Sequence, residues 1–113
     1  MSILKEFEIE VLQRLGGRTL SPQQVVQLSV EGEFVSLNFT GVGYFLTLQH
    51  SILPKERVVM EKPILSGKVG DLLTGFVAFS EDGKVTLECF SYGIETVPQN
   101  FRDLDVRVTE QAI

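Results

Sequence analysis

The chain has 113 residues, with 10 Lys and Arg against 15 Asp and Glu, so it carries a formal net charge of −5 near neutral pH. This length supports one domain with one core, and 43% apolar against 22% charged residues argues against intrinsic disorder. The acidic balance argues against nucleic-acid binding, a single Cys excludes an intrachain disulfide, and with one His the chain has no cluster typical of a metal site.

The first residues argue against secretion and membrane insertion. Glu6 and Glu8 interrupt the apolar stretch that a secretory signal needs, and no later apolar run is long enough for a membrane span. We therefore expect a cytoplasmic protein without a membrane partner. Neither Gly41–Gly43 nor Gly67–Lys68 completes a nucleotide-binding motif, so we also expect no cofactor.

The first predicted element is a helix over residues 4–15. Its apolar stripe consists of Leu4, Phe7, Val11 and Leu15. Strong helix formers fill the segment, and Gly16-Gly17 would end it. A strand is the alternative, because residues 6–11 alternate polar and apolar side chains, whereas the helix leaves Glu8 near the apolar stripe.

Residues 21–24 are predicted to begin a second helix, with Ser21 in the capping position and Pro22 next. We expect this helix to extend for only about one turn. Alternation then predicts a strand over residues 26–30, and the pattern resumes over residues 33–49. Because this second run is long for one strand and contains Gly41 and Gly43, we expect the strand to bend there and continue in a new direction.

The segment 50–70 is the least regular part of the chain. Pro54 and Pro63 each lack a backbone donor, so residues 57–61 are predicted to form at most a short edge strand. Residues 67–71, which contain two glycines, are predicted to form a loop.

The clearest predicted hairpin consists of strands at residues 74–80 and 84–92, joined by a turn at 81–83. Both faces of these strands are apolar, which is typical of central strands that are covered on both sides. A last strand over residues 104–109 alternates apolar and polar side chains, so one of its faces should meet water.

Together these elements predict an α+β fold in which residues 1–113 form a single globular domain. In this fold the N-terminal helix packs on a curved, mostly antiparallel sheet of about five or six strands. The apolar residues of the sheet outnumber what one helix can cover, so strand curvature or a second subunit should cover the remainder.

Aromatic side chains gather near the predicted bend and in the last long strand. The candidate ligand- or partner-binding residues are Gly41, Gly43, Tyr44, Glu88, Phe90 and Tyr92. If the bent sheet brings them together, they could line a pocket or an interface, since aromatic residues are enriched in both. The alternative is that they pack as ordinary core residues.

Catalysis has weaker support. Cys89 lies within an apolar strand and His50 follows another, so a nucleophile–base pair between them is not expected. Glu88 shares its strand face with Phe90 and Tyr92, a setting that could raise the pKa of its carboxyl group and suit acid–base chemistry. The alternative is that its carboxylate reaches solvent or a backbone donor.

Several motifs resemble a group of small, largely bacterial proteins of uncharacterised function. The motifs are Thr40-Gly41-Val42-Gly43-Tyr44-Phe45, Gly75-Phe76-Val77-Ala78-Phe79 with Asp82-Gly83, Leu87-Glu88 with Phe90, Tyr92 and Gly93, and Pro98. The likeness spans residues 38–106, with Tyr44 where that group has Phe and Val97 where it has an aromatic residue before Pro98. The resemblance implies a shared α+β fold and no catalytic residues. Some small acidic proteins of this kind look like inhibitors of bacterial toxins, an analogy of size and charge alone.

We therefore expect a non-catalytic binding module whose partner is another protein or a second copy of the chain. A small-molecule-binding domain with an aromatic pocket is the alternative. A hydrolase or isomerase that uses Glu88 ranks third.

Overall fold

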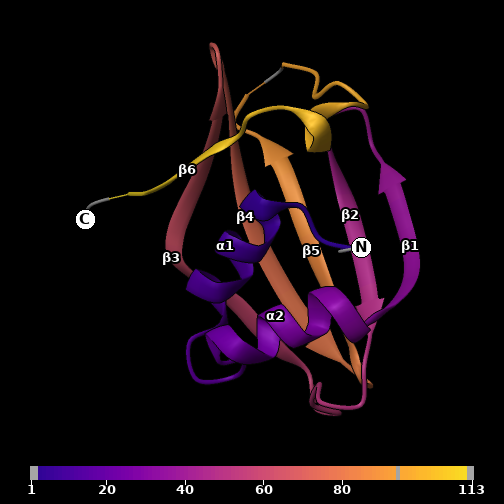
Figure 1. Ribbon diagram of the computed structural model, residues 1–113. Coiled ribbons are helices and arrows are strands. Elements are labelled where there is room, and N and C mark those ends of the chain that lie inside the picture. The colour runs from indigo at the N-terminus through magenta and orange to yellow at the C-terminus, as the bar shows by residue number, and fades with distance from the viewer. Residues whose placement is uncertain (1–2, 94, 112–113) are drawn as a thin grey trace.

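The computed structural model describes residues 3–93 and 95–111, which form two helices packed on one six-stranded sheet (Figure 1). In chain order the elements are α1 (Glu6–Gly16), α2 (Pro22–Glu31), β1 (Glu33–Phe39), β2 (Gly43–Gln49), β3 (Val58–Val69), β4 (Leu72–Glu81), β5 (Lys84–Ser91), the 3-10 helix η1 (Phe101–Asp103) and β6 (Arg107–Glu110). The strand order is β1-β2-β5-β4-β3-β6, and all neighbours are antiparallel. This confirms the α+β class and the packing of the N-terminal helix on an antiparallel sheet.

Helix α1 confirms the helical prediction for the first segment and excludes the strand alternative. The Glu8 carboxylate accepts a hydrogen bond from the backbone N–H of Lys5 at 2.8 Å, which satisfies a donor that the helix itself leaves free. At the other end Gly17 has φ of +51°, a conformation that glycine adopts readily. The buried side of α1 includes Phe7, Glu8, Val11, Leu12 and Leu15.

Helix α2 is longer than predicted, and the strand expected at residues 26–30 is wrong. The capping box forms as expected, since Ser21 Oγ accepts from the Gln24 N–H at 3.1 Å and Gln24 Oε1 accepts from the Ser21 N–H at 2.9 Å. The helix continues because Val25 and Leu28, three residues apart, both enter the core. The alternation of apolar residues in this segment came from side chains on opposite sides of a helix.

The bend expected within residues 33–49 is a complete chain reversal that separates β1 from β2. The two strands pair antiparallel from Glu33–Gln49 to Phe39–Tyr44. Gly41, in the turn, has φ of +89°. Gly43 lies so close to β5 that a Cβ atom added to it would be 1.8 Å from the Cys89 carbonyl oxygen.

Strand β3 is also longer than predicted, because it continues past Pro63 to Val69. Its register with β4 shifts between Met60 and Leu65, so Pro63 lies where the ladder is already interrupted and its missing donor costs no ladder bond. Residues 67–69, predicted as part of a loop, lie in this strand, and residues 65–68 pair with β6.

The central hairpin, β4 with β5, confirms the prediction from residues 74–92. Asp82 and Gly83 have φ of 55° and 75°, as the commonest two-residue hairpin turn requires. Both strands are central in the sheet. The two helices lie on the same face (Figure 1), so within the described part of the chain no element covers the other face, and the expected cover by a second subunit stays a prediction.

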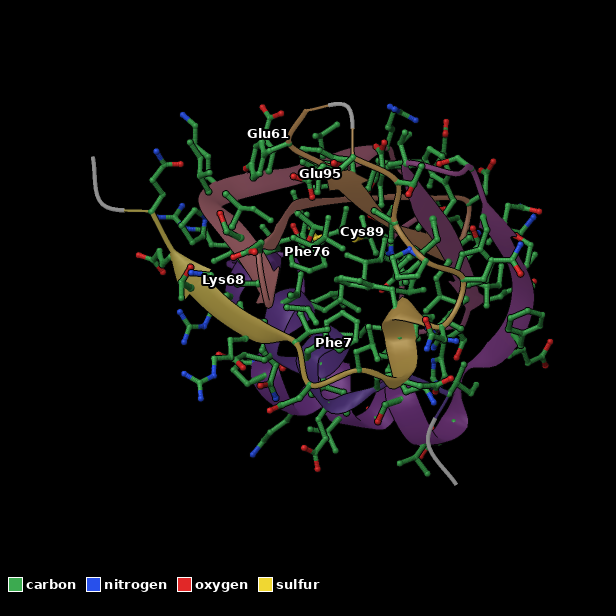
Figure 2. The ribbon with its side chains drawn as sticks, turned by 90° about the horizontal axis from the view of Figure 1, so that it is seen from above. Phe7, Glu61, Lys68, Phe76, Cys89 and Glu95 are labelled. Carbon is green, nitrogen blue, oxygen red and sulfur yellow. The ribbon has the colours of Figure 1, made fainter. Side chains whose placement is uncertain are left out.

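The core lies between the helices and the sheet, which curves around them when seen from above (Figure 2). Phe7 of α1 points toward Phe76 of β4, with ring centroids 6.0 Å apart. Phe101 of η1 contacts Phe7 edge-on at 5.8 Å, so the C-terminal segment closes one end of the core.

A Gly43→Ala substitution should destabilise the protein by about 1–3 kcal/mol or more, because the added methyl group has no space beside the β5 backbone. Chemical denaturation measures the change. Asn38→Ala, at an exposed position of β1, is the control and should alter the free energy of unfolding by about 0.5 kcal/mol or less. Equal stability of the two variants would contradict the close approach of β2 to β5 at Gly43.

Candidate functional site

The two faces of the sheet differ in what covers them. On the face toward the helices, β2 and β5 contribute the buried residues Tyr44, Leu46, Leu48, Val85, Leu87 and Cys89. The opposite face, here called the outer face, comprises Phe45, Thr47, Val59, Val77, Phe79, Thr86, Glu88 and Phe90. In Figure 2, Phe76 and Cys89 lie inside the curve of the sheet, whereas Glu61 lies outside it. No described helix or strand covers the outer face.

The middle of the outer face is a cross-strand row of Phe45, Glu88 and Val77. In the next row the hydroxyl oxygens of Thr47 and Thr86 lie 2.9 Å apart and form a hydrogen bond. Apolar side chains therefore surround one acidic side chain near the centre of an uncovered sheet face.

One corner of the outer face is already occupied by a side chain of this chain. The Arg57 guanidinium lies 4.9 Å from the centroid of the Phe79 ring, and it also contacts Glu81 at 3.3 Å. A cation over an aromatic ring is favourable on an exposed surface. The same chemistry can therefore act elsewhere on this face if a partner supplies the cation.

Glu88 is half-buried, and its carboxylate has no hydrogen bond or ion pair with any residue in the described part of the chain. Glu61, which lies on the same side of the sheet, is exposed and equally unpaired among those residues. Two carboxylates beside an apolar surface are suited to a cationic partner, because burying them without one would cost several kcal/mol.

A hollow of about 320 Å³ adjoins Val77 where the register of β3 shifts. Its lining includes Glu61, Lys62, Ile64, Val77, Phe90 and Tyr92. The rings of Phe90 and Tyr92 meet edge-to-face with centroids 5.5 Å apart. Gly75 is required beneath them, because a Cβ atom there would lie 2.6 Å from the Phe90 ring.

The structure divides the six predicted site residues between two faces. Glu88, Phe90 and Tyr92 lie together on the outer side, as the predicted site requires, whereas Tyr44 is fully buried beneath the helices. A pocket shared by Tyr44 with Phe90 and Tyr92 is therefore wrong. The reason is the pleat: Tyr44 pairs with Cys89, not with Phe90, so it shares the covered face.

The two predicted glycines have local structural explanations. Gly41 supplies the positive φ of the β1–β2 turn, and its carbonyl accepts a hydrogen bond from the Val97 N–H at 2.9 Å. Gly43 allows the close approach to β5 described above. Neither glycine lines the hollow beside Phe90.

The Tyr44 hydroxyl belongs to a buried polar cluster. It donates to the Glu8 carboxylate at 2.6 Å, and Glu8 is 0% exposed. Burial, followed by the negative charge of Glu8, raises the pKa of Tyr44 above its ordinary value. Tyr44 therefore serves as a neutral hydrogen-bond donor.

Arg102 of η1 completes this cluster and was not predicted from the sequence. Its guanidinium donates to both oxygens of Glu8, at 2.7 and 2.8 Å, and to the Ile3 carbonyl at 3.0 Å. The hydrogen bonds to Glu8 raise the pKa of Arg102. Next to it, the contact with Lys5 at 2.9 Å lowers the pKa of Asp103. The one sequence signal was a glutamate at the edge of the apolar stripe.

Cys89 and His50 do not form a nucleophile–base pair. Burial raises the pKa of the Cys89 thiol to about 12, and this side chain lies on the covered face. The ring nitrogens of His50 contact other groups: Nδ1 accepts from the Ile52 N–H at 3.0 Å and Nε2 lies 3.1 Å from Glu31. Hydrogen bonds from Gln27 and His50 lower the pKa of Glu31.

A larger hollow, of about 450 Å³, lies beside His50 at the end of the sheet. Its lining includes the exposed polar side chains of Gln49, Lys55 and Asp82. Since both ring nitrogens of His50 already have contacts, this imidazole is not a free base in the hollow. The outer face is the better candidate, because it combines uncovered apolar area with unpaired charge.

No protein-family model, curated protein or solved structure matches this chain. Within the described residues there is no group of three or more His, Cys, Asp or Glu side chains that could hold a metal ion. Neither of the helices that the structure describes is long and apolar enough to cross a membrane.

Replacing Arg102 by Met should lower the free energy of unfolding by about 3–5 kcal/mol, because it leaves the buried Glu8 carboxylate without its cation. Arg14→Met is the matched control. Its ion pairs with Glu10 and Glu110 are exposed, so the loss should stay below about 1 kcal/mol. Adding Glu8→Gln to Arg102→Met should recover part of the loss. Similar losses from the two Arg variants in urea denaturation would contradict this role of Arg102.

Stability should decrease as the pH rises from about 9 toward 12. The Cys89 thiol ionises near 9.0 when unfolded but near 12 when folded, so the unfolded state loses its proton first and is favoured. Tyr44 adds to the decrease above about pH 10, since its pKa is also raised. Urea denaturation across this range should show a smaller decrease for Cys89→Ala than for the wild type; equal decreases would contradict the prediction.

Proposed function

We propose that this protein is a non-catalytic binding module and that its outer face binds another protein. The observation that carries the proposal is the uncovered centre of the sheet, where Phe45 and Val77 flank the unpaired Glu88. These three residues are half-buried, and an apolar surface beside polar groups that no element of its own chain covers is typical of protein-binding surfaces. Phe90 and Tyr92 extend this patch along the same side.

The charges on the outer face favour a partner with a basic and apolar surface. Glu88 and Glu61 have no cation of their own among the described residues, and the whole chain carries a net charge of −5. An Arg or Lys from the partner would pair with Glu88 while its aliphatic part packs on Val77. An acidic inhibitor of a basic toxin would fit this description, an analogy that rests on size and charge.

A second copy of the chain is a poorer occupant of the outer face. Glu88 is in β5, the third of six strands, so it lies near the middle of the face. Two outer faces packed about a two-fold axis would place the two Glu88 carboxylates near each other, and buried like charges cost several kcal/mol.

Small-molecule binding is the second candidate function, and the hollow beside Phe90 and Tyr92 favours it. The hollow is continuous with the outer face through Val77, so it can also receive a side chain of a protein partner. Glu88 has no hydrogen-bonded group that could act with it in catalysis, and the hydrolase or isomerase hypothesis stays third.

The test compares capture of partner proteins from a lysate of the host cells by the immobilised wild type, Glu88→Lys and Glu6→Lys. Glu6 is an exposed glutamate of α1, on the other side of the molecule, and provides the same charge change. A basic protein should be retained by the wild type and by Glu6→Lys. Its retention by Glu88→Lys should fall at least about tenfold, which corresponds to about 1.4 kcal/mol.

Retention that is unchanged by Glu88→Lys would contradict the proposal, as would equal losses from both variants. Thermal unfolding of the three proteins excludes a folding defect as the cause. Raised salt should weaken capture by the wild type, because it screens the long-range attraction between this acidic chain and a basic partner.

A further inference from the structure

The hollow beside Phe90 and Tyr92, here called the aromatic hollow, lies where β3 leaves its ladder with β4. Residues 61–64 of β3 lie opposite Val77 alone, because the paired positions on either side of them are 60 and 65. The extra residues of a bulge move away from the partner strand, and here they leave a space of about 320 Å³. Ligand pockets start at about 300 Å³, so this space suits one side chain or a compact ligand.

Two aromatic rings form one wall of the aromatic hollow. Phe90 and Tyr92 meet at 77° with ring centroids 5.5 Å apart, and the Tyr92 hydroxyl lies 2.8 Å from the place of a Cβ atom added to Gly75. Tyr92 is 45% exposed, so a ligand can reach its ring. Within the described part of the chain no cation lies over either ring. Both rings are therefore available to a cation from outside.

The charged groups around the aromatic hollow are two carboxylates and one ammonium group. Glu61 and Lys62 line the hollow, and Glu88 adjoins it across Val77. None of these three charges forms an ion pair with another residue that the structure describes. The local excess of one negative charge favours a cationic ligand.

An organic cation suits the aromatic hollow better than a metal ion. Ca²⁺ and Mg²⁺ take about six oxygen ligands or more, whereas Glu61 is the one carboxylate that lines this largely apolar space. A guanidinium group is planar and weakly hydrated, stacks on aromatic rings and pairs with a carboxylate through two N–H groups. Arg57 shows this chemistry on the same face, since its guanidinium lies 4.9 Å from the Phe79 ring centroid and 3.3 Å from Glu81.

We propose that the aromatic hollow is a guanidinium site that takes an arginine side chain of the protein partner. The guanidinium group lies against the rings of Phe90 and Tyr92 and pairs with Glu61, while the methylene groups of the arginine pack on Val77. Glu88, on the other side of Val77, remains for a second basic side chain. This inference rests on the proposed function for the source of the arginine, and it names the group that the hollow recognises.

NMR titration with N-acetyl-arginine methylamide tests the site, because this probe has the guanidinium group and its stem without the backbone charges of a free amino acid. N-acetyl-citrulline methylamide is the matched probe, with an uncharged urea of the same shape. At constant ionic strength, the arginine probe should shift the signals of Val77, Phe90 and Tyr92 with a dissociation constant of about 1–10 mM. The citrulline probe should bind at least about fivefold more weakly.

Four variants show whether the named groups hold the probe. Glu61→Gln should weaken binding of the arginine probe by about fivefold, and Tyr92→Leu by about threefold. Lys62→Gln removes a cation that opposes the probe, so it should strengthen binding by about twofold. Glu6→Gln, on α1, is the control and should leave the affinity unchanged. All four positions are exposed, and thermal unfolding checks that each variant folds.

Absence of these shifts at concentrations about tenfold above the expected dissociation constant would overturn the guanidinium site. Equal binding of the citrulline probe, or equal affinities of Glu61→Gln and Glu6→Gln, would also do so. If Glu88→Lys still abolishes capture of the basic protein in that case, the proposed function stands and only the site fails.

Capture of the basic protein by Glu61→Gln tests the source of the arginine. Its retention should fall by about fivefold, as for the probe. A probe that binds while Glu61→Gln captures as well as the wild type would overturn the partner's arginine as the occupant, and a free guanidinium compound would take its place.

Discussion

The buried pair of Glu8 and Arg102 is the interaction on which the arrangement of this protein depends. It joins the first helix to the 3-10 helix near the C-terminus, and through Tyr44 it reaches the sheet. A buried carboxylate without these donors would cost several kcal/mol. The hydrogen bonds of Glu8 to Tyr44 and Arg102 therefore hold helix α1 over the sheet face that contains Tyr44. No described helix packs on the opposite face.

The uncovered surfaces follow from this arrangement. Two helices on one side cover the core but neither the outer face nor the β1 edge. These two surfaces differ in chemistry. The outer face combines apolar residues with the unpaired Glu88, whereas β1 is almost without charge. The outer face, with its unpaired carboxylates, is the surface that we propose binds a cationic partner.

Local patterns predicted the fold class well where spacing was unambiguous. The α1 stripe and the Asp82-Gly83 turn both gave elements that the structure confirms. Two kinds of segment were predicted wrongly: a short segment whose apolar spacing fits both a helix and a strand, and a strand that contains a proline. Val26, Leu28 and Val30 alternate like a strand, although Val25 and Leu28 are the residues in the core. Pro63 was expected to end a strand, but the register shift in β3 accommodates it.

Spacing over a few residues was enough to predict the α+β class, the hairpin of β4 and β5, and the position of Glu88, Phe90 and Tyr92 along one side of the chain. That Tyr44 belongs to the core and that Arg102 pairs with Glu8 became evident only from the folded chain. These depend on strand register and on a contact between residues 94 positions apart in the chain. Strand register and a contact between distant residues follow from how all the elements pack together, and the spacing of neighbouring residues does not predict them.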